Sequence, residues 1–153
     1  MNIRSDQKNR IKTILESIVY NSSNLPVFIG VKTQNDQWPY AFITSGGLTP
    51  NKDGGTLRDR GTYERVREYQ VTLLFMLDDS SPSLNQVEIQ IDQLEQLVIN
   101  KLGEEATRND GQSWFDLYVT SVSEPINGQE LQIIGNTLAK IFTIVAETQE
   151  EYS

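Results

Sequence analysis

The sequence predicts an α+β fold, in which two main helices pack on an antiparallel or mixed β-sheet and a long β-hairpin arm projects from it. Three observations support this fold class. Apolar residues recur at helical spacing in residues 3–20 and again in the residues before Leu102. Several other stretches alternate apolar and polar residues, as strands do. Most of these strands are joined by short links, which connect antiparallel neighbours.

The longest predicted strand is Thr62–Leu77, and the other elements are expected to pack around it. From Tyr69 onward apolar side chains occur on both of its faces, which is typical of a strand covered on both sides. Before Tyr69 it carries two glutamates and two arginines, so we expect this half to face water. A strand of this length measures about 50 Å, whereas a domain of this size is only about 40 Å across. We therefore expect the charged half to project as an arm that contacts another molecule.

Two amphipathic helices are expected on the sheet. The first spans residues 3–20, and its apolar stripe consists of Ile11, Ile14, Leu15, Ile18 and Val19. Its side facing water is expected to hold Arg4, Lys8, Lys12 and Glu16. The second helix is predicted to begin after a cap at Ser81 or Ser83 and to end at Leu102, with Gly103 as the stop.

The other predicted strands are shorter. Residues 25–31 and 38–44 are expected to form a hairpin that turns at Asn35-Asp36. Residues 113–123 and 138–148 alternate in the same way and complete the sheet.

Two smaller features lie near the C-terminal end. Asn127-Gly128 is a tight-turn dipeptide, after which residues 129–134 are predicted to pair back as a short strand. Residues 149–153 are polar and acidic, and we expect them to be frayed.

Residues 45–61 are predicted to be a long flexible loop at the tip of the arm. They hold five of the ten glycines, and the loop exceeds the roughly 12–15 residues beyond which structureless loops become uncommon. Loops of this length are usually functional or disordered, and a surface loop without a role is the alternative. Glycine pairs surround Lys52, but the spacing of a phosphate-binding loop is absent.

Composition excludes several kinds of site. The chain has no cysteine and no histidine, so disulfides, zinc–thiolate sites, thiol nucleophiles and Ser-His-Asp triads are excluded. Asp78-Asp79, Asp116 and Lys140 are the only candidates for a metal-dependent nuclease, and the first pair is better explained as a strand end before a helix. We therefore expect no enzyme activity, and neither a catalytic, a metal nor a cofactor site.

Four aromatic residues could instead form a stacking platform for bases or sugars. They are Trp38, Tyr40, Trp114 and Tyr118. Aromatic residues at alternate strand positions more often belong to a core or a subunit interface. No apolar run approaches the roughly 18 residues of a membrane span, and residues 1–10 lack the apolar centre of a signal peptide. We therefore expect one domain over residues 1–153 that is neither inserted in a membrane nor secreted.

Charge is divided unevenly along the chain. The net charge is −8, but residues 1–67 carry ten Lys and Arg against six Asp and Glu, a balance of +4. Residues 68–153 carry three against fifteen, a balance of −12. An acidic chain is a poor nonspecific nucleic-acid binder. Opposite charges on two parts of one chain can join copies head to tail, unless the two parts interleave in the fold and the asymmetry averages away.

The order of these elements resembles one protein family. An amphipathic helix is followed by a hairpin, a glycine-rich loop and the long strand RVREYQVTLLFML. A helix closed by Leu102-Gly103 and a last strand LAKIFTIVAET complete the 153 residues. This layout resembles the tail-terminator, or tail-completion, proteins of long-tailed bacteriophages over nearly the whole chain.

The resemblance implies a hexameric ring that sits on the finished tail tube, ends tube polymerisation and meets the head-side connector. DNA would pass through the lumen without specific binding, and the protein would be assembled in the host cytoplasm and reside in the virion. A head-completion or neck protein, or a small-molecule binding module that uses the aromatic residues, are the alternatives.

Contacts with a neighbouring subunit or the tail tube are expected from the loop and the charged half of the long strand. The expected contact residues are Gly46, Gly47, Lys52, Arg58, Arg60, Arg65 and Arg67. Their acidic counterpart on a neighbour is expected near Glu88, Asp92 and Glu95.

Overall fold

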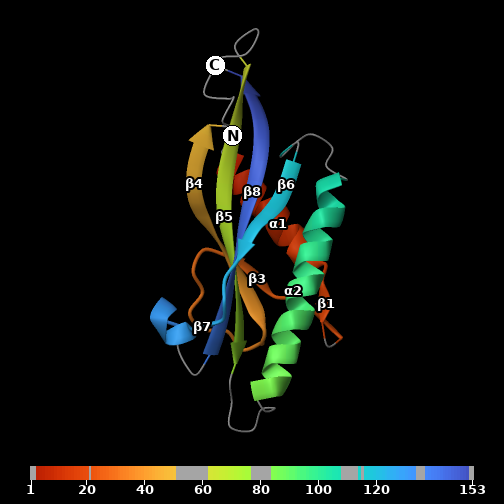
Figure 1. Cartoon of the computed structure of the whole chain (residues 1–153), viewed down its shortest axis with the longest axis vertical. Coiled ribbons are helices and arrows are strands. Elements are labelled where there is room, and N and C mark those ends of the chain that lie inside the picture. The colour runs from red at the N-terminus through yellow and green to blue at the C-terminus, as the bar shows by residue number, and fades with distance from the viewer. Residues whose placement is uncertain are drawn as a thin grey trace.

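The computed structural model describes residues 3–20, 22–50, 62–76, 84–107, 114, 116–133 and 137–151, and Figure 1 shows their arrangement. In chain order the elements are α1 (Ile3–Glu16), β1 (Val19–Tyr20), β2 (Ser23–Asn24), β3 (Val27–Ile29), β4 (Tyr40–Pro50), β5 (Thr62–Met76), α2 (Leu84–Thr107), β6 (Asp116–Val122), β7 (Ile126–Asn127), the 3₁₀-helix η2 (Gly128–Leu131) and β8 (Thr137–Glu151). Two helices packed on a mixed β-sheet confirm the predicted α+β fold class.

The main sheet has the strand order β3-β4-β5-β8-β6, and β7 pairs with β8. The predicted central strand is confirmed, because β5 lies between β4 and β8 and is antiparallel to both. Along the described length of β5, its charged half is also flanked: Arg65 lies opposite Pro50 of β4 and Thr148 of β8. The predicted two-stranded arm is therefore not confirmed, since these residues belong to a three-stranded ribbon.

The predicted hairpin of residues 25–31 and 38–44 is wrong. β3 and β4 are parallel neighbours, with Val27 opposite Ala41. Gly30 ends β3 with φ at 90°, a conformation that suits glycine, and the following residues return to the end of the sheet where β3 began. The hydroxyl of Tyr40 holds this return segment by donating to the carbonyl oxygen of Lys32 at 2.6 Å.

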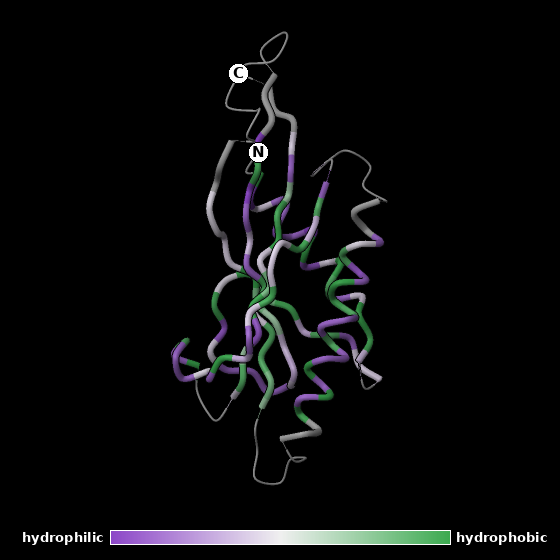
Figure 2. Tube along the Cα trace, in the orientation of Figure 1, coloured by the Kyte–Doolittle hydropathy of each residue, from purple (hydrophilic) through white to green (hydrophobic). Residues whose placement is uncertain are grey.

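Both helices lie on one face of the sheet, and Figure 1 shows α1 behind the strands. The odd-numbered side chains of β5 from Tyr69 to Phe75 face these helices, as the alternation predicted. They join one core with α1 residues such as Leu15 and α2 residues such as Leu94. In Figure 2 hydrophobic residues are frequent along the strands in the middle of the molecule.

A smaller cluster covers part of the other face. It consists of Tyr40, Phe42, Leu74, Ile133 and Ala139, with Phe28, Trp38 and Leu131 against it. The prediction that the apolar half of the long strand is covered on both sides is confirmed by the burial of Leu74. The four aromatic residues do not form one platform, because Trp38 and Tyr40 pack in this cluster and Trp114 in the main core.

Several predicted boundaries are wrong because tertiary contacts override local signals. α1 ends at Glu16, so Val19 is not a buried helical residue but 60% exposed in β1. β4 continues to Pro50 because β5 pairs with it, so only residues 51–61 of the predicted loop remain, and these lie outside the described residues.

The predicted ends of the later elements also need correction. α2 continues through Gly103 to Thr107, because a glycine inside a helix costs only about 1 kcal/mol and does not by itself end it. Residues 128–131 form η2 instead of a strand, because the side chain of Asn127 accepts from the backbone of Gln129 and caps a helical turn. Of residues 149–153, expected to be frayed, 149–151 extend β8 opposite β5, and 152–153 lie outside the described residues.

Candidate interaction surface

Arg4 fastens the first turn of α1 to an irregular part of β4. The register of β4 against β5 shifts at Gly46 and Gly47, which form a bulge. The guanidinium of Arg4 donates to the carbonyl oxygens of Gly46 at 3.2 Å and Gly47 at 2.9 Å. It also donates to the carbonyl oxygen of Glu68 at 3.2 Å. A planar group with five N–H donors can satisfy several carbonyls at once, and the bulge presents them together.

Gly46 suits this site because its backbone passes close to β5. A Cβ at this position would lie 3.1 Å from the carbonyl oxygen of Glu68, which is tighter than ordinary contact. At Gly47 nothing lies within 4 Å of such a Cβ. The close approach of the two strands at the bulge therefore favours glycine at position 46, whereas it places no such limit on position 47.

Tyr69 lies against Arg4 and is fully buried. The guanidinium carbon of Arg4 is 5.3 Å from the ring centroid, within cation–π range. The hydroxyl of Tyr69 donates to the side-chain oxygen of Gln7, which is also buried. Burial raises the pKa of Tyr69 to about 12, although the positive charges of Arg4 and Arg67 oppose the shift. The phenol is therefore a protonated donor at neutral pH.

The two arginines of β5 continue up the strand on the same face as Tyr69. The sequence predicts that both face water, but Arg67 is only 7% exposed, and its guanidinium donates to the hydroxyl of Thr148 at 3.2 Å. Arg65 is half-buried. The flanking strand β8 covers Arg67 and supplies its partner, so this correction follows from the three-stranded ribbon. We call the group of Arg4, Arg65 and Arg67 the basic face, although Arg67 itself is buried.

The structure brings together some of the predicted contact residues. Gly46 and Gly47 lie in the bulge, beside the strand that carries Arg65 and Arg67. The other three predicted residues lie outside the described residues: Lys52, Arg58 and Arg60.

Sequence reasoning placed Arg4 on the side of the first helix that faces water and missed its role. Its position already contained a signal, because Arg4, Gln7, Ile11 and Ile14 follow helical i, i+3, i+4 spacing. Arg4 and Gln7 therefore extend the buried stripe by one turn toward the N-terminus. Polar residues in line with an apolar stripe indicate polar contacts beneath the helix.

The opposite face of this part of the sheet, which includes β6, is acidic. Strand alternation directs Glu68 of β5 away from Tyr69, and pairing places Val145 of β8 opposite it. Tyr118 of β6 lies on the other side of Val145 and is 40% exposed. One step along the strands, Asp116 and Glu147 lie directly opposite each other. We call the surface of these five residues the acidic face.

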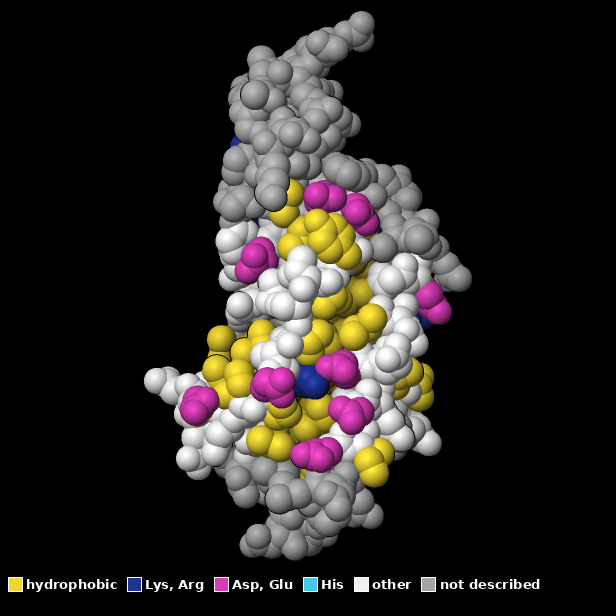
Figure 3. Space-filling model, viewed as in Figure 1, with side chains coloured by type: hydrophobic (Ala, Val, Ile, Leu, Met, Phe, Trp, Pro, Cys, Tyr) yellow, Lys and Arg dark blue, Asp and Glu magenta, His cyan; other side chains and the backbone are white. Residues whose placement is uncertain are grey.

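The surroundings of Tyr118 reflect this charge. Partial burial raises the pKa of its phenol, and the neighbouring carboxylates of Glu147 and Asp116 raise it further. An interaction of the hydroxyl with the Glu147 carboxylate raises the pKa as well. Acidic side chains predominate over basic ones in the view of Figure 3, where they adjoin hydrophobic side chains.

A second acidic surface lies on α2. Glu88 and Asp92 are exposed on it. Glu95, the third residue expected to receive arginines, already has a partner, since its carboxylate lies 2.7 Å from the ammonium group of Lys140 on β8. Two of the three predicted acidic residues are therefore more accessible than the third.

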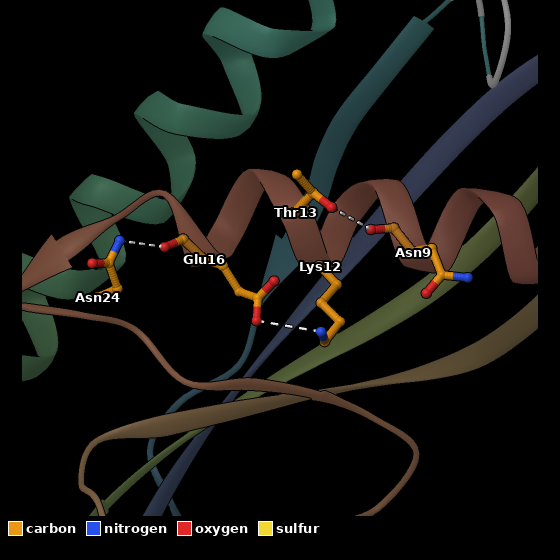
Figure 4. Close-up of polar contacts among 5 residues, drawn as sticks. All are labelled: Asn9, Lys12, Thr13, Glu16 and Asn24. Atoms are coloured by element: carbon orange, nitrogen blue, oxygen red, sulfur yellow. Dashed lines mark hydrogen bonds and ion pairs between the residues drawn. The ribbon is translucent and has the colours of Figure 1, made fainter.

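The outer side of α1 is occupied by local contacts, which Figure 4 shows. Lys12 and Glu16 form an ion pair at 3.3 Å, and the hydroxyl of Thr13 donates to the carbonyl oxygen of Asn9 at 3.0 Å. The side chain of Asn24 donates to the carbonyl oxygen of Glu16 at 2.8 Å and ties the end of α1 to β2. These contacts stabilise the end of α1 and present no catalytic arrangement.

Within the described part of the chain, no three acidic side chains gather closely enough to hold a metal ion. Nor does any helix among those residues have the length and apolar character to span a membrane. In comparisons with known proteins, no family model matches the sequence. No curated protein matches it either. The function of the chain must therefore be inferred from the arrangement of its strands and their charged side chains.

Proposed function

We propose that this chain is a structural protein of a long-tailed bacteriophage, which forms a ring on the tail tube, ends tube polymerisation and joins the tail to the head connector. The observation that carries this proposal is the layer of strands β4, β5, β8 and β6, in which Arg65 lies on the side of α1 and the carboxylates of Glu68, Asp116 and Glu147 lie on the other side. A protein with two complementary faces can associate head to tail, and such contacts form a ring when the rotation from one subunit to the next closes.

The kind of ring is proposed from the resemblance in layout to tail-terminator proteins. The element order predicted from the sequence, a helix, shorter strands, the long strand, a second helix and further strands, agrees with the fold. In this proposal the ring is hexameric, the tail tube and the head-side connector are its partners, and the virion is its location. Its role is structural and requires no cofactor.

The test has two readouts. The first is the mass of the purified chain at high concentration, where a ring-forming protein sediments as a hexamer. The second is tube length, measured by electron microscopy when the phage's tube protein polymerises with and without this chain. We expect shorter, capped tubes when the chain is present. A chain that stays monomeric and leaves tube length unchanged would refute the proposal.

The Glu16→Gln variant provides a matched control. It changes a charge on the outer side of α1, away from the ribbon, and disturbs only an exposed ion pair. We expect this variant to assemble and to cap tubes as the unaltered chain does.

A further inference from the structure

We propose that strand β3 pairs edge to edge with β3 of a second copy of this chain, in an antiparallel contact centred on Ile29. This contact is two-fold, so it closes after two copies and is separate from the head-to-tail contact of the proposed ring. It is therefore a second mode of association, which pairs single chains or whole rings.

The backbone hydrogen bonds of β3 show which of its residues face outward. The N–H of Ala41 on β4 donates to the carbonyl oxygen of Pro26 at 2.9 Å. The N–H of Gly30 donates to the carbonyl oxygen of Ile43, also on β4, at 2.8 Å. Residues 26 and 30 thus face β4, and so does residue 28 between them, because backbone direction alternates along a strand. Ile29 therefore directs its N–H and its carbonyl away from β4.

This outer edge of β3 is unpaired and apolar. β3 ends the order of strands in the main sheet, and the outward groups of Ile29 have no backbone partner within the described part of the chain. The side chain of Ile29 is 42% exposed, and that of Val31, just beyond the strand, is 63% exposed. Pro26 does not block the edge, because the side on which it lacks an N–H faces β4. An unpaired edge of this kind is a template for another strand.

The strand at the other end of the sheet, β6, is protected. The N–H of Leu117 donates to the carboxylate of Asp116 at 3.0 Å, so this donor is not offered to another strand. The same carboxylate brings negative charge to β6, and charge at a sheet edge discourages pairing. By contrast, the segment from Leu25 to Val31 contains no charged residue.

A second copy of the chain fits the edge of β3 because the edge is complementary to itself. In an antiparallel pair centred on Ile29, the two copies of this residue exchange both of their outward hydrogen bonds. Their exposed side chains then lie next to each other on one face of the joined sheet, and no charges of residues 25–31 oppose each other. A short edge buries little surface, so we expect the pairing to be weak and concentration-dependent.

Pairing can be tested by light scattering over a concentration series up to about 1 mM. We expect the mass to double as the concentration rises, from one chain to two or from one ring to two. Ile29→Pro removes the outward N–H and no hydrogen bond to β4, and proline is tolerated at such edge positions. We expect it to raise the concentration for half-pairing at least tenfold. A mass that never doubles over this range would overturn the inference.

Two further variants at the same position separate the backbone from the side chain. Ile29→Thr keeps the N–H and the β-branched shape, so it should raise the half-pairing concentration less than Ile29→Pro does. Equal rises in the two variants would overturn the backbone contact. Thermal melts followed by circular dichroism establish folding. If Ile29→Pro fails to fold, Ile29→Lys replaces it, because two lysines then meet at the two-fold axis and should also cause at least a tenfold rise.

A matched control places the same charge on the other edge strand. Ser121 is exposed on β6, and we expect Ser121→Lys to pair as the unaltered chain does. Both lysine variants change the net charge equally, so a difference between them reports the position of the charge. Loss of pairing in Ser121→Lys with normal pairing in Ile29→Lys would overturn the inference in favour of β6.

Hydrogen exchange of single amides gives a direct readout of the edge. In the unpaired chain the amide of Gly30 is protected by its bond to Ile43, whereas the amide of Ile29 exchanges freely. At high concentration the exchange of Ile29 should slow at least tenfold. A rate at Ile29 that does not depend on concentration would overturn the inference.

The outcomes distinguish this inference from the proposed function. A chain that forms pairs and no larger species would support the edge contact and remove the ring. Rings that never double in mass would leave the ring standing and overturn the pairing. Protection of the Ile29 amide only after addition of the phage's tube protein would replace the second copy by a strand of that protein.

Discussion

Lys140 on β8 and Glu95 on α2 form an ion pair, with 2.7 Å between the ammonium nitrogen and a carboxylate oxygen. Their side chains are 12% and 28% exposed, so the pair lies largely under the helix instead of on the surface. It joins α2 to the strand that runs beside β5. Since the two residues are far apart in sequence, the pair forms only when helix and sheet are both in place.

Glu95→Gln should lower the free energy of unfolding by about 1–3 kcal/mol, because Lys140 would then be left largely buried without its anionic partner. Glu16→Gln removes a carboxylate from the exposed pair with Lys12 and should cost only about 0–1 kcal/mol. Urea denaturation of both variants makes the comparison. Equal losses would show that burial adds nothing to the pair of Lys140.

Arg4→Ala should destabilise the chain by about 2–3 kcal/mol, since it removes charge-assisted hydrogen bonds to three backbone carbonyls and the contact with Tyr69. Lys8→Ala, one turn along the same helix, should change stability by no more than about 0.5 kcal/mol. Arg4→Lys should recover only part of the loss because an ammonium group lacks the planar fork. Full recovery in the lysine variant would mean that charge alone matters at this position.

Phe75→Ala should cost about 3–5 kcal/mol, because the ring is buried in the core beneath the helices and its loss leaves a cavity. The next residue gives a matched control. Met76 points to the other face and is 38% exposed, so Met76→Ala should cost about 1 kcal/mol or less. Chemical denaturation measures both. A larger loss at Met76 would reverse the assignment of the two faces of β5.

Tyr69 should make stability fall at high pH. Its pKa is about 12 in the fold and near 10 in the unfolded chain, so the neutral phenol favours folding fully below pH 10. As the pH rises from 10 to 12, this contribution of about 2–3 kcal/mol is lost, because the unfolded state gives up its proton first. Tyr69→Phe should show a smaller decline over that range in denaturation experiments. Parallel curves for the two chains would place the titration elsewhere.

The local periodicities of this chain were readable from its sequence. Period-two alternation predicts which side chains of Thr62–Met76 share a face, and the apolar stripe identifies Ile11, Leu15 and the core residues of the second helix. These features depend on backbone geometry, which is set within a few residues. They suffice for the α+β fold class and for the central position of the longest strand.

Only the tertiary structure decided how these elements meet. The sequence signals for β3 and β4 are the same whether the strands are parallel or antiparallel, and the return of the chain after Gly30 made them parallel. A charged strand end looks solvated from sequence, but β8 pairs along it and buries Arg67 against Thr148. Arg4 likewise has no local reason to bind a bulge about forty residues away. Contacts between distant residues depend on packing and register, which local stereochemistry does not determine.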